Sequence, residues 1–143
     1  MSQISPRHLS RELALKVLFS LSQNQKADPD QLFDYVKDGF YSKLKKNEIW
    51  REIFEKVLKN KEKNLSWIKE FATSFSMEKT NPIDISILEI LITEIFYLKI
   101  PTPVPVAVNE AILLANEYWK DWSASFINWV IAQVNKKYGK SSK

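Results

Sequence analysis

The most apolar stretch of the chain runs over residues 81–99, with the sequence NPIDISILEILITEIFYLK. Asn81 suits the N-cap of a helix, and the proline that follows it suits the first helical position. Apolar side chains cover nearly every face of this helix, which is typical of a helix surrounded by protein. Asp84, Glu89 and Glu94 interrupt the run, whereas a membrane-spanning helix needs about 20 predominantly apolar residues. The pattern therefore predicts a buried central helix in an all-α fold.

Six further helices are predicted from the hydrophobic periodicity on either side of the central one. They are expected at about residues 5–24, 28–39, 47–63, 64–75, 106–119 and from 123 or 125 onward. Asp28 before a proline repeats the cap signal, and Asn64 is interpreted as a break or a new cap. The alternating prolines of residues 100–106 (IPTPVPV) predict an extended connector, because proline lacks a backbone donor and disfavours helix. A proline-rich recognition ligand is the alternative for that segment.

Composition narrows the class of protein. The chain has 143 residues, two glycines and no cysteine. This length predicts one domain over residues 1–143, with a core of useful size. The scarcity of glycine argues against a sheet. The absence of cysteine excludes disulfides, and the first twenty residues are too polar for a signal peptide, so a cytoplasmic protein is predicted.

Both ends of the chain are basic. Cationic side chains outnumber acidic ones in residues 1–27, and no acidic residue follows Asp121. A Lys-rich tail is expected from about residue 136 onward. This asymmetry suits a polyanion held by the two termini, if the fold brings them together. A solvated surface with a frayed tail is the alternative interpretation of the same charges.

The first helix has an apolar stripe, and the face opposite to this stripe is mostly basic. The opposite face carries Arg7, His8, Arg11, Leu15, Lys16 and Phe19. Single-stranded RNA binding requires cations that contact phosphates and an outward aromatic ring on which a base stacks. The basic face of this helix therefore predicts an RNA-binding surface. The alternative is that Phe19 packs against a later helix.

No catalytic site is predicted. The sequence has no Gly-rich phosphate loop, no metal-spaced His/Cys cluster and no Ser nucleophile elbow. His8 is the only histidine and is expected to lie among cations. Glu110 and Glu117 have a two-turn spacing that is common by chance. The sequence thus predicts a binding protein rather than an enzyme, with no cofactor, no metal and no membrane partner.

Several motifs resemble the NusB family of transcription antitermination factors over almost the whole chain. They are Arg11-Glu12-x-Ala14 and Leu18-Phe19, then Ile83-Asp84-x3-Leu88-x5-Glu94, then VAVNEAILLA at 106–115, then Phe126-Ile127-Asn128. The resemblance implies a seven-helix NusB-like fold, in agreement with the seven helices predicted above. It also implies binding of single-stranded boxA-type leader RNA together with NusE, a small-subunit ribosomal protein. Contact with the RNA polymerase elongation complex would be indirect.

The resemblance assigns roles to single residues. Implied RNA contacts are Arg7, His8, Arg11, Lys16, Phe19, Phe126 and Asn128. Phe19 falls where the family usually has a tyrosine that contacts RNA, and Phe126 falls on an aromatic position of the last helix. Asp84 matches an acidic position that faces NusE, and Glu89 is predicted to lie at the same interface. The first and last helices are expected to lie together at the RNA surface.

These assignments predict which substitutions the fold tolerates. Arg7→Glu combined with Arg11→Glu is expected to weaken RNA binding with little loss of helicity, because both side chains are placed on an exposed face. Asp84→Lys is expected to impair NusE binding and leave the isolated fold intact. Phe19→Ala is expected to reduce mainly RNA affinity. Phe126→Ala is expected to reduce both RNA affinity and stability, because its spacing also places it on a buried stripe.

The chain departs from the family pattern at several positions. Glu89 stands where the family has an arginine, and Trp129 stands where it has a glycine. Trp119 and Trp122 are further departures. The three tryptophans provide either a stacking surface for RNA or a protein interface. The alternative function is therefore a NusB-fold protein–protein interaction or dimerisation module, such as a homodimer, with weakened RNA binding.

Overall fold

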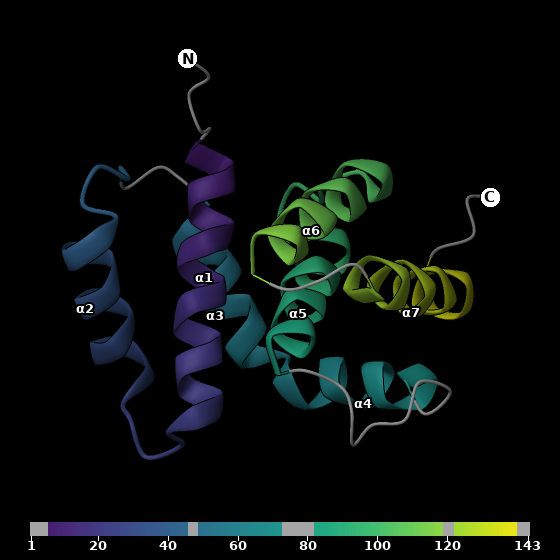
Figure 1. Ribbon diagram of the computed structural model, residues 1–143, viewed down its shortest axis with the longest axis horizontal. Coiled ribbons are helices and arrows are strands. Elements are labelled where there is room, and N and C mark those ends of the chain that lie inside the picture. Colours follow the sequence, from purple (N-terminus) through teal and green to yellow (C-terminus); the bar gives the residue numbers. More distant parts are fainter. Residues whose placement is uncertain (1–5, 46–48, 73–81, 119–121, 140–143) are drawn as a thin grey trace.

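The computed structural model describes residues 6–45, 49–72, 82–118 and 122–139. In these segments the chain forms helices and no strand (Figure 1). The helices are α1 (Pro6–Gln23), α2 (Pro29–Phe40), α3 (Trp50–Lys59), α4 (Lys61–Ala72), α5 (Pro82–Phe96), α6 (Val104–Tyr118) and α7 (Trp122–Tyr138). The predicted all-α, seven-helix architecture is confirmed. No helix of the described segments is long and apolar enough to span a membrane.

Helix α5 is the central element of the fold. It packs against α1, α3, α4, α6 and α7 (Figure 1). Its apolar side chains are fully or almost fully buried from Ile87 to Ile92. Burial on every side explains why the sequence of this helix is apolar around its whole circumference. The prediction of a buried central helix is confirmed.

A second, smaller core lies between α1, α2 and α3. Phe33 of α2 is fully buried there, with its ring centroid 5.2 Å from Trp50 and 4.4 Å from Phe54 of α3. Helix α1 therefore has protein on two sides, because Leu13 faces this core while Leu15 is buried in the main one. The prediction that Leu15 lies on a solvent-exposed face is wrong for this reason.

Helix boundaries follow the cap signals in one place and depart from them in another. The Asp28 carboxylate accepts a hydrogen bond at 2.9 Å from the backbone N–H of Gln31, so the predicted cap of α2 is confirmed. Asn64, by contrast, lies inside α4 and is completely buried. The break between α3 and α4 is at Asn60, whose backbone N–H bonds the carbonyl of Lys56.

The proline-rich segment is shorter than the sequence predicts. Residues 101–103 are extended, but α6 already begins at Val104. Pro105 is tolerated in the first turn of α6, where a missing N–H removes no helical hydrogen bond. The N–H of Ala107 closes this turn by donating to the carbonyl of Pro103 at 2.9 Å. The prediction of an extended chain through residue 106 is therefore wrong at its C-terminal end.

Some expectations concern residues outside the described segments. These are the helix start at Asn47, the N-cap at Asn81, and Trp119. The side chain of Trp122 is also outside the described part, although its backbone begins α7.

Candidate nucleic-acid and protein interfaces

Arg11 is the centre of a buried ion-pair network that joins three helices. Its Nε and Nη2 atoms donate to the two carboxylate oxygens of Glu94 on α5, at 2.6 and 2.8 Å. Nη1 lies 3.3 Å from Oε1 of Glu110 on α6. Glu94 also accepts hydrogen bonds from the hydroxyl of Thr102 and, through its carbonyl, from the Thr102 backbone, both at 2.8 Å.

This network corrects the role expected for Arg11. The arginine is 3% exposed, because α1 packs against α5 on the face that the sequence pattern assigns to solvent. A buried guanidinium requires a paired carboxylate, and Glu94 satisfies that requirement in a bidentate arrangement. Arg11 therefore fixes α1 on α5, and its predicted position on an exposed face is wrong. We now expect Arg11→Glu to destabilise the fold, because it would place a carboxylate beside the buried Glu94.

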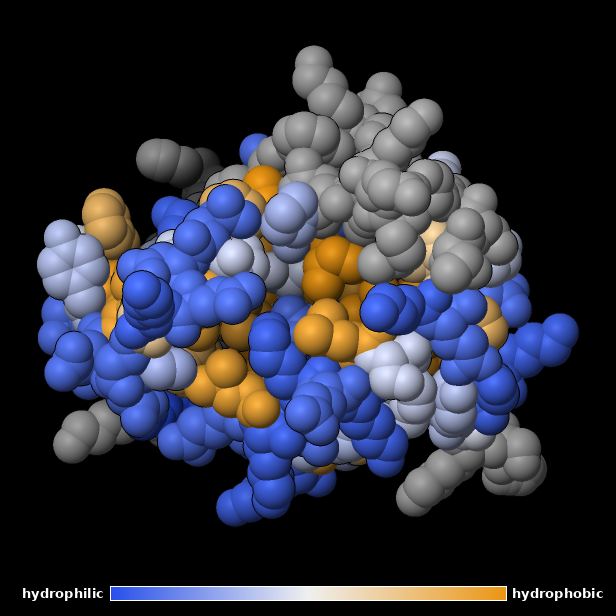
Figure 2. All heavy atoms as spheres, turned by 90° about the horizontal axis from the view of Figure 1, so that it is seen from below, coloured by the Kyte–Doolittle hydropathy of each residue, from blue (hydrophilic) through white to orange (hydrophobic). Residues whose placement is uncertain are grey.

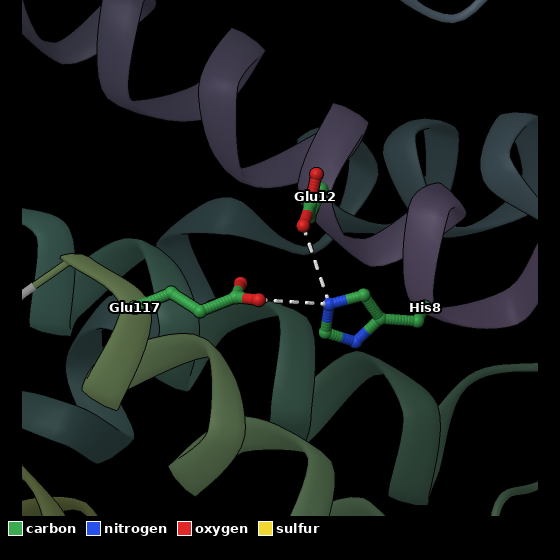
Figure 3. A group of neighbouring side chains, drawn as sticks. All are labelled: His8, Glu12 and Glu117. Carbon is green, nitrogen blue, oxygen red and sulfur yellow. Dashed lines mark ion pairs between the residues drawn. The ribbon is translucent and has the colours of Figure 1, made fainter. Parts of the chain in front are cut away.

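His8 lies among carboxylates, and not among cations as the sequence predicts. Its Nδ1 is 3.3 Å from Glu110 Oε1, and its Nε2 is 3.2 Å from Glu12 Oε2 and 3.4 Å from Glu117 Oε2. Figure 3 shows Glu12 of α1 and Glu117 of α6 directed at the same ring nitrogen. Glu110 and Glu117 are two turns apart on α6 and so lie on the same face of that helix. Both of their carboxylates contact His8 of α1.

The other residues of the predicted α1 surface differ in exposure. Arg7 is exposed at the beginning of the helix. Lys16 is half-buried, with Nζ 5.1 Å from the centroid of the Tyr41 ring. Phe19 is also half-buried and lines a hollow of about 50 Å³ together with Leu15, Lys16 and Ile83. The alternative that Phe19 packs against a later helix agrees with its position beside Ile83 of α5.

Helix α7 presents a different surface from the one expected. Phe126 is completely buried in the main core, so its ring does not reach the surface. Asn128 and Trp129 are exposed, and Trp129 is 36% exposed. An open hollow of about 350 Å³ on this helix is lined by Ser125, Asn128, Trp129 and Ala132. The predicted exposure of Phe126 is wrong, and among the described side chains of α7 the ring of Trp129 is exposed.

The two basic ends do not form one surface in the described part of the chain. Helix α1 packs mainly on α2, α3 and α5, whereas α7 packs on α4, α5 and α6 (Figure 1). Lys137 at the end of α7 is paired with Glu70 of α4, and the Tyr138 hydroxyl donates to the same carboxylate at 2.5 Å. These hydrogen bonds hold the pKa of Glu70 below its usual value. The prediction that the first and last helices lie together is wrong.

An apolar groove lies where the C-terminal end of α1, the α3–α4 junction and the first turns of α5 meet. Its volume is about 390 Å³. The lining residues are Leu21, Ser22, Gln25, Leu58, Lys61, Leu65, Pro82, Ile85, Ser86 and Glu89. A neighbouring hollow of about 670 Å³ along α4 shares Leu65 and Ile85 with this groove. Figure 2 shows the molecule from below the view of Figure 1. Apolar side chains gather near the middle of that face, among hydrophilic ones.

Both predicted NusE contacts are buried at or near this groove. Asp84 is fully buried in the first turn of α5, and Glu89 is 2% exposed. Lys61 donates to Glu89 Oε2 at 3.0 Å, and burial raises the pKa of Glu89 although Lys61 offsets part of this effect. Because a buried carboxylate cannot be exchanged for a longer ammonium group at low cost, we now expect Asp84→Lys to destabilise the fold rather than to spare it.

The groove itself was not visible in the sequence. Leu65 and Ile85 belong to two different helices, and Leu21 belongs to a third, so no single periodic stripe marks their common surface. The available signal was indirect, because Leu65 is an apolar residue between two polar ones, Asn64 and Ser66, on a short helix. Only the packing of α1, α4 and α5 brings these side chains to one place.

Comparison with known proteins identifies the family. The model of the NusB family matches residues 8–136. The chain belongs to the NusB family. A relative in Alkaliphilus oremlandii, named "Transcription antitermination protein NusB", is 32% identical over 133 residues, covering 93% of this chain and 95% of the relative. A protein of the same name in Finegoldia magna is 30% identical, covering 92% of this chain and 94% of that protein.

Solved structures of the family share the fold. The NusB structure from T. maritima superposes with a TM-score of 0.83 at 22% identity, covering 96% of this chain and 95% of that one. A structure titled "Crystal Structure of Antitermination Factors NusB and NusE in complex with dsRNA" gives a TM-score of 0.78 at 19% identity, covering 95% of this chain. At these identities the agreement concerns the arrangement of the helices.

Proposed function

We propose that this protein is an RNA-binding transcription antitermination factor that acts together with NusE on boxA-type leader RNA. The observation that carries the proposal is family membership over residues 8–136, with relatives named for antitermination. In this proposal residues 1–143 form one RNA-binding domain. The domain acts by binding RNA and NusE and does not catalyse a reaction. A factor of this kind works where transcription takes place, which is the cytoplasm of a bacterium.

The proposed RNA contacts lie at two separate places, the N-terminal end of α1 and the exposed face of α7. Arg7 supplies an exposed cation for phosphate contact. Asn128 supplies an exposed amide, and Trp129 supplies a partly exposed ring on which an unpaired base can stack. In this arrangement Trp129 takes the stacking role that sequence reasoning gave to Phe126.

The substitution Arg7→Glu tests this surface. We expect RNA affinity to fall at least several-fold and the slope of log affinity against log salt to decrease by about 1, because one phosphate contact is lost. Fluorescence anisotropy of a labelled boxA-type RNA at several salt concentrations measures both quantities. Lys59→Glu makes the same charge change at the exposed C-terminal end of α3 and serves as the control. Equal losses in the two variants would remove Arg7 from the RNA surface.

The proposed NusE surface is the apolar groove between α1, α4 and α5. Protein interfaces have apolar centres with few charges. Among the described residues that line this groove, Lys61 and Glu89 form a charged pair and the others are uncharged. We expect Leu65→Glu to weaken NusE binding at least tenfold, because it places a charge in the centre of the contact. Isothermal titration calorimetry with purified NusE measures this change.

Ile100→Glu is the matched control for the groove variant. Ile100 is 83% exposed between α5 and α6, so it receives the same apolar-to-acidic change away from the groove. NusE affinity should match that of the wild type in this control. Unchanged NusE affinity in folded Leu65→Glu would place the NusE contact elsewhere on the molecule.

A second candidate function is an interaction or dimerisation module. The partial exposure of Trp129 beside an open hollow on α7 favours it. Such an interface depends on apolar burial and should change little with salt, whereas phosphate contacts weaken steeply. The salt series with labelled RNA therefore separates the two functions.

A further inference from the structure

The two nitrogens of the His8 ring face different carboxylates. Nδ1 faces Glu110 at 3.3 Å, whereas Nε2 faces both Glu12 and Glu117. A neutral imidazole carries a proton on only one nitrogen. When that proton is on Nδ1 and is donated to Glu110, Nε2 and two carboxylate oxygens are three electron-pair donors directed at one another. A metal cation between these three atoms would accept an electron pair from each of them.

We propose that His8, Glu12 and Glu117 form a binding site for a divalent metal ion of the zinc class. One ligand atom from each residue lies within 4.8 Å of the other two. Tetrahedral zinc, with bonds of about 2.0–2.2 Å to nitrogen and oxygen, holds its ligand atoms about 3.3–3.5 Å apart. The two separations from Nε2, 3.2 and 3.4 Å, agree with that geometry (Figure 3). Water completes the coordination.

A second layer of contacts orients the three ligands. The Tyr41 hydroxyl donates to Glu12 Oε1 at 3.1 Å, which leaves Oε2 directed at His8. Glu110 accepts from Nδ1 of His8, and its carboxylate is in turn 3.3 Å from Arg11. A histidine ligand whose other nitrogen bonds a carboxylate is a common arrangement in protein metal sites, because it fixes the tautomer and the ring orientation.

Charge and access also favour a cation. Glu12, Glu110 and Glu117 surround one imidazole, and the nearby Arg11 is already paired with Glu94. The His8 and Glu12 side chains are 13% and 15% exposed, and Glu117 is 45% exposed, so solvent reaches the cluster from the Glu117 side. A bound ion would connect the first turns of α1 to the last turn of α6.

Zinc titration of the protein without an affinity tag tests the proposal. We expect calorimetry to show one zinc ion per chain. His8 is the only histidine in the sequence, so its imidazole resonances can be assigned without ambiguity and should shift on zinc binding. At a hundredfold excess over Kd, the melting temperature should rise by roughly 5–10 °C.

Four variants locate the site. Glu117→Gln and His8→Ala remove a ligand each and should weaken zinc binding at least tenfold, and Glu110→Gln should weaken it about 10–100-fold through the second layer. Glu117 is partly exposed, so its variant is expected to fold. Glu62→Gln, at an exposed position of α4, should bind as the wild type does. Equal zinc affinity in wild type and Glu117→Gln, or imidazole resonances unmoved at saturating zinc, would overturn the proposed site.

Discussion

The variant Glu94→Ala is expected to lose about 3–5 kcal/mol of unfolding free energy. It removes the bidentate carboxylate partner of the buried Arg11 guanidinium, which among the described residues keeps only the single contact with Glu110 at 3.3 Å. The Arg11 and Glu94 side chains are 4% and 2% exposed, so water cannot replace the lost partner without opening the contact between α1 and α5. Urea unfolding followed by circular dichroism measures the change. A loss below about 1 kcal/mol would show that this pair does not hold the helices together.

The double variant Arg11→Met with Glu94→Leu separates the ion pair from the packing around it. Replacing both charges by apolar side chains of similar size is often close to neutral, because neither charge has to be desolvated. We therefore expect it to be more stable than Glu94→Ala. Glu55→Ala is the control, because Glu55 forms an exposed pair with Arg51 on α3 and its loss should change stability little.

Phe126→Ala is expected to cost about 3–5 kcal/mol of unfolding free energy, because it removes a fully buried ring from the main core. Trp129, three positions further along α7, is partly exposed, and Trp129→Ala should cost clearly less. RNA affinity should respond in the opposite order, with the larger loss in Trp129→Ala. Thermal unfolding and RNA anisotropy of the same two proteins measure both effects.

The opposite order of RNA affinities would contradict this prediction. If folded Phe126→Ala loses more RNA affinity than Trp129→Ala, then Phe126 must reach the RNA through a rearrangement of α7. That outcome would restore the role that the family resemblance gives to Phe126. Loss of stability without loss of RNA affinity in both variants would remove α7 from the proposed RNA surface.

The sequence predicted the central helix because its signal is local. A long apolar run with a proline at its first helical position needs no information from the rest of the chain. The acidic residues of α5 were a further local signal, because they indicate that the buried helix has cationic partners. Glu89 and Glu94 inside a buried helix require partners, and the structure supplies Lys61 and Arg11. The sequence could not predict which cations pair with these carboxylates, because Arg11 is 83 positions away from Glu94 along the chain.

The errors at the candidate site have one physical cause. A helical wheel assigns one buried stripe, but α1 packs against α2 and α3 on one side and against α5 on the other. Residues opposite to the stripe, such as Arg11 and Leu15, are therefore interior positions. The His8 cluster depends in the same way on α6 lying beside α1. Local cap signals failed at Asn64 for a related reason, because its environment is set by α5 and not by its chain neighbours.

The most direct test of the proposed function is a titration of labelled single-stranded boxA-type RNA with the wild-type protein, with and without NusE. We expect NusE to tighten RNA binding, and RNA to tighten NusE binding by the same factor, because coupling between two sites is reciprocal. We also expect at least a tenfold loss of RNA affinity when the salt concentration rises from about 50 to 200 mM. RNA binding that is absent in both titrations, or that NusE and salt leave unchanged, would contradict the assignment as an antitermination factor.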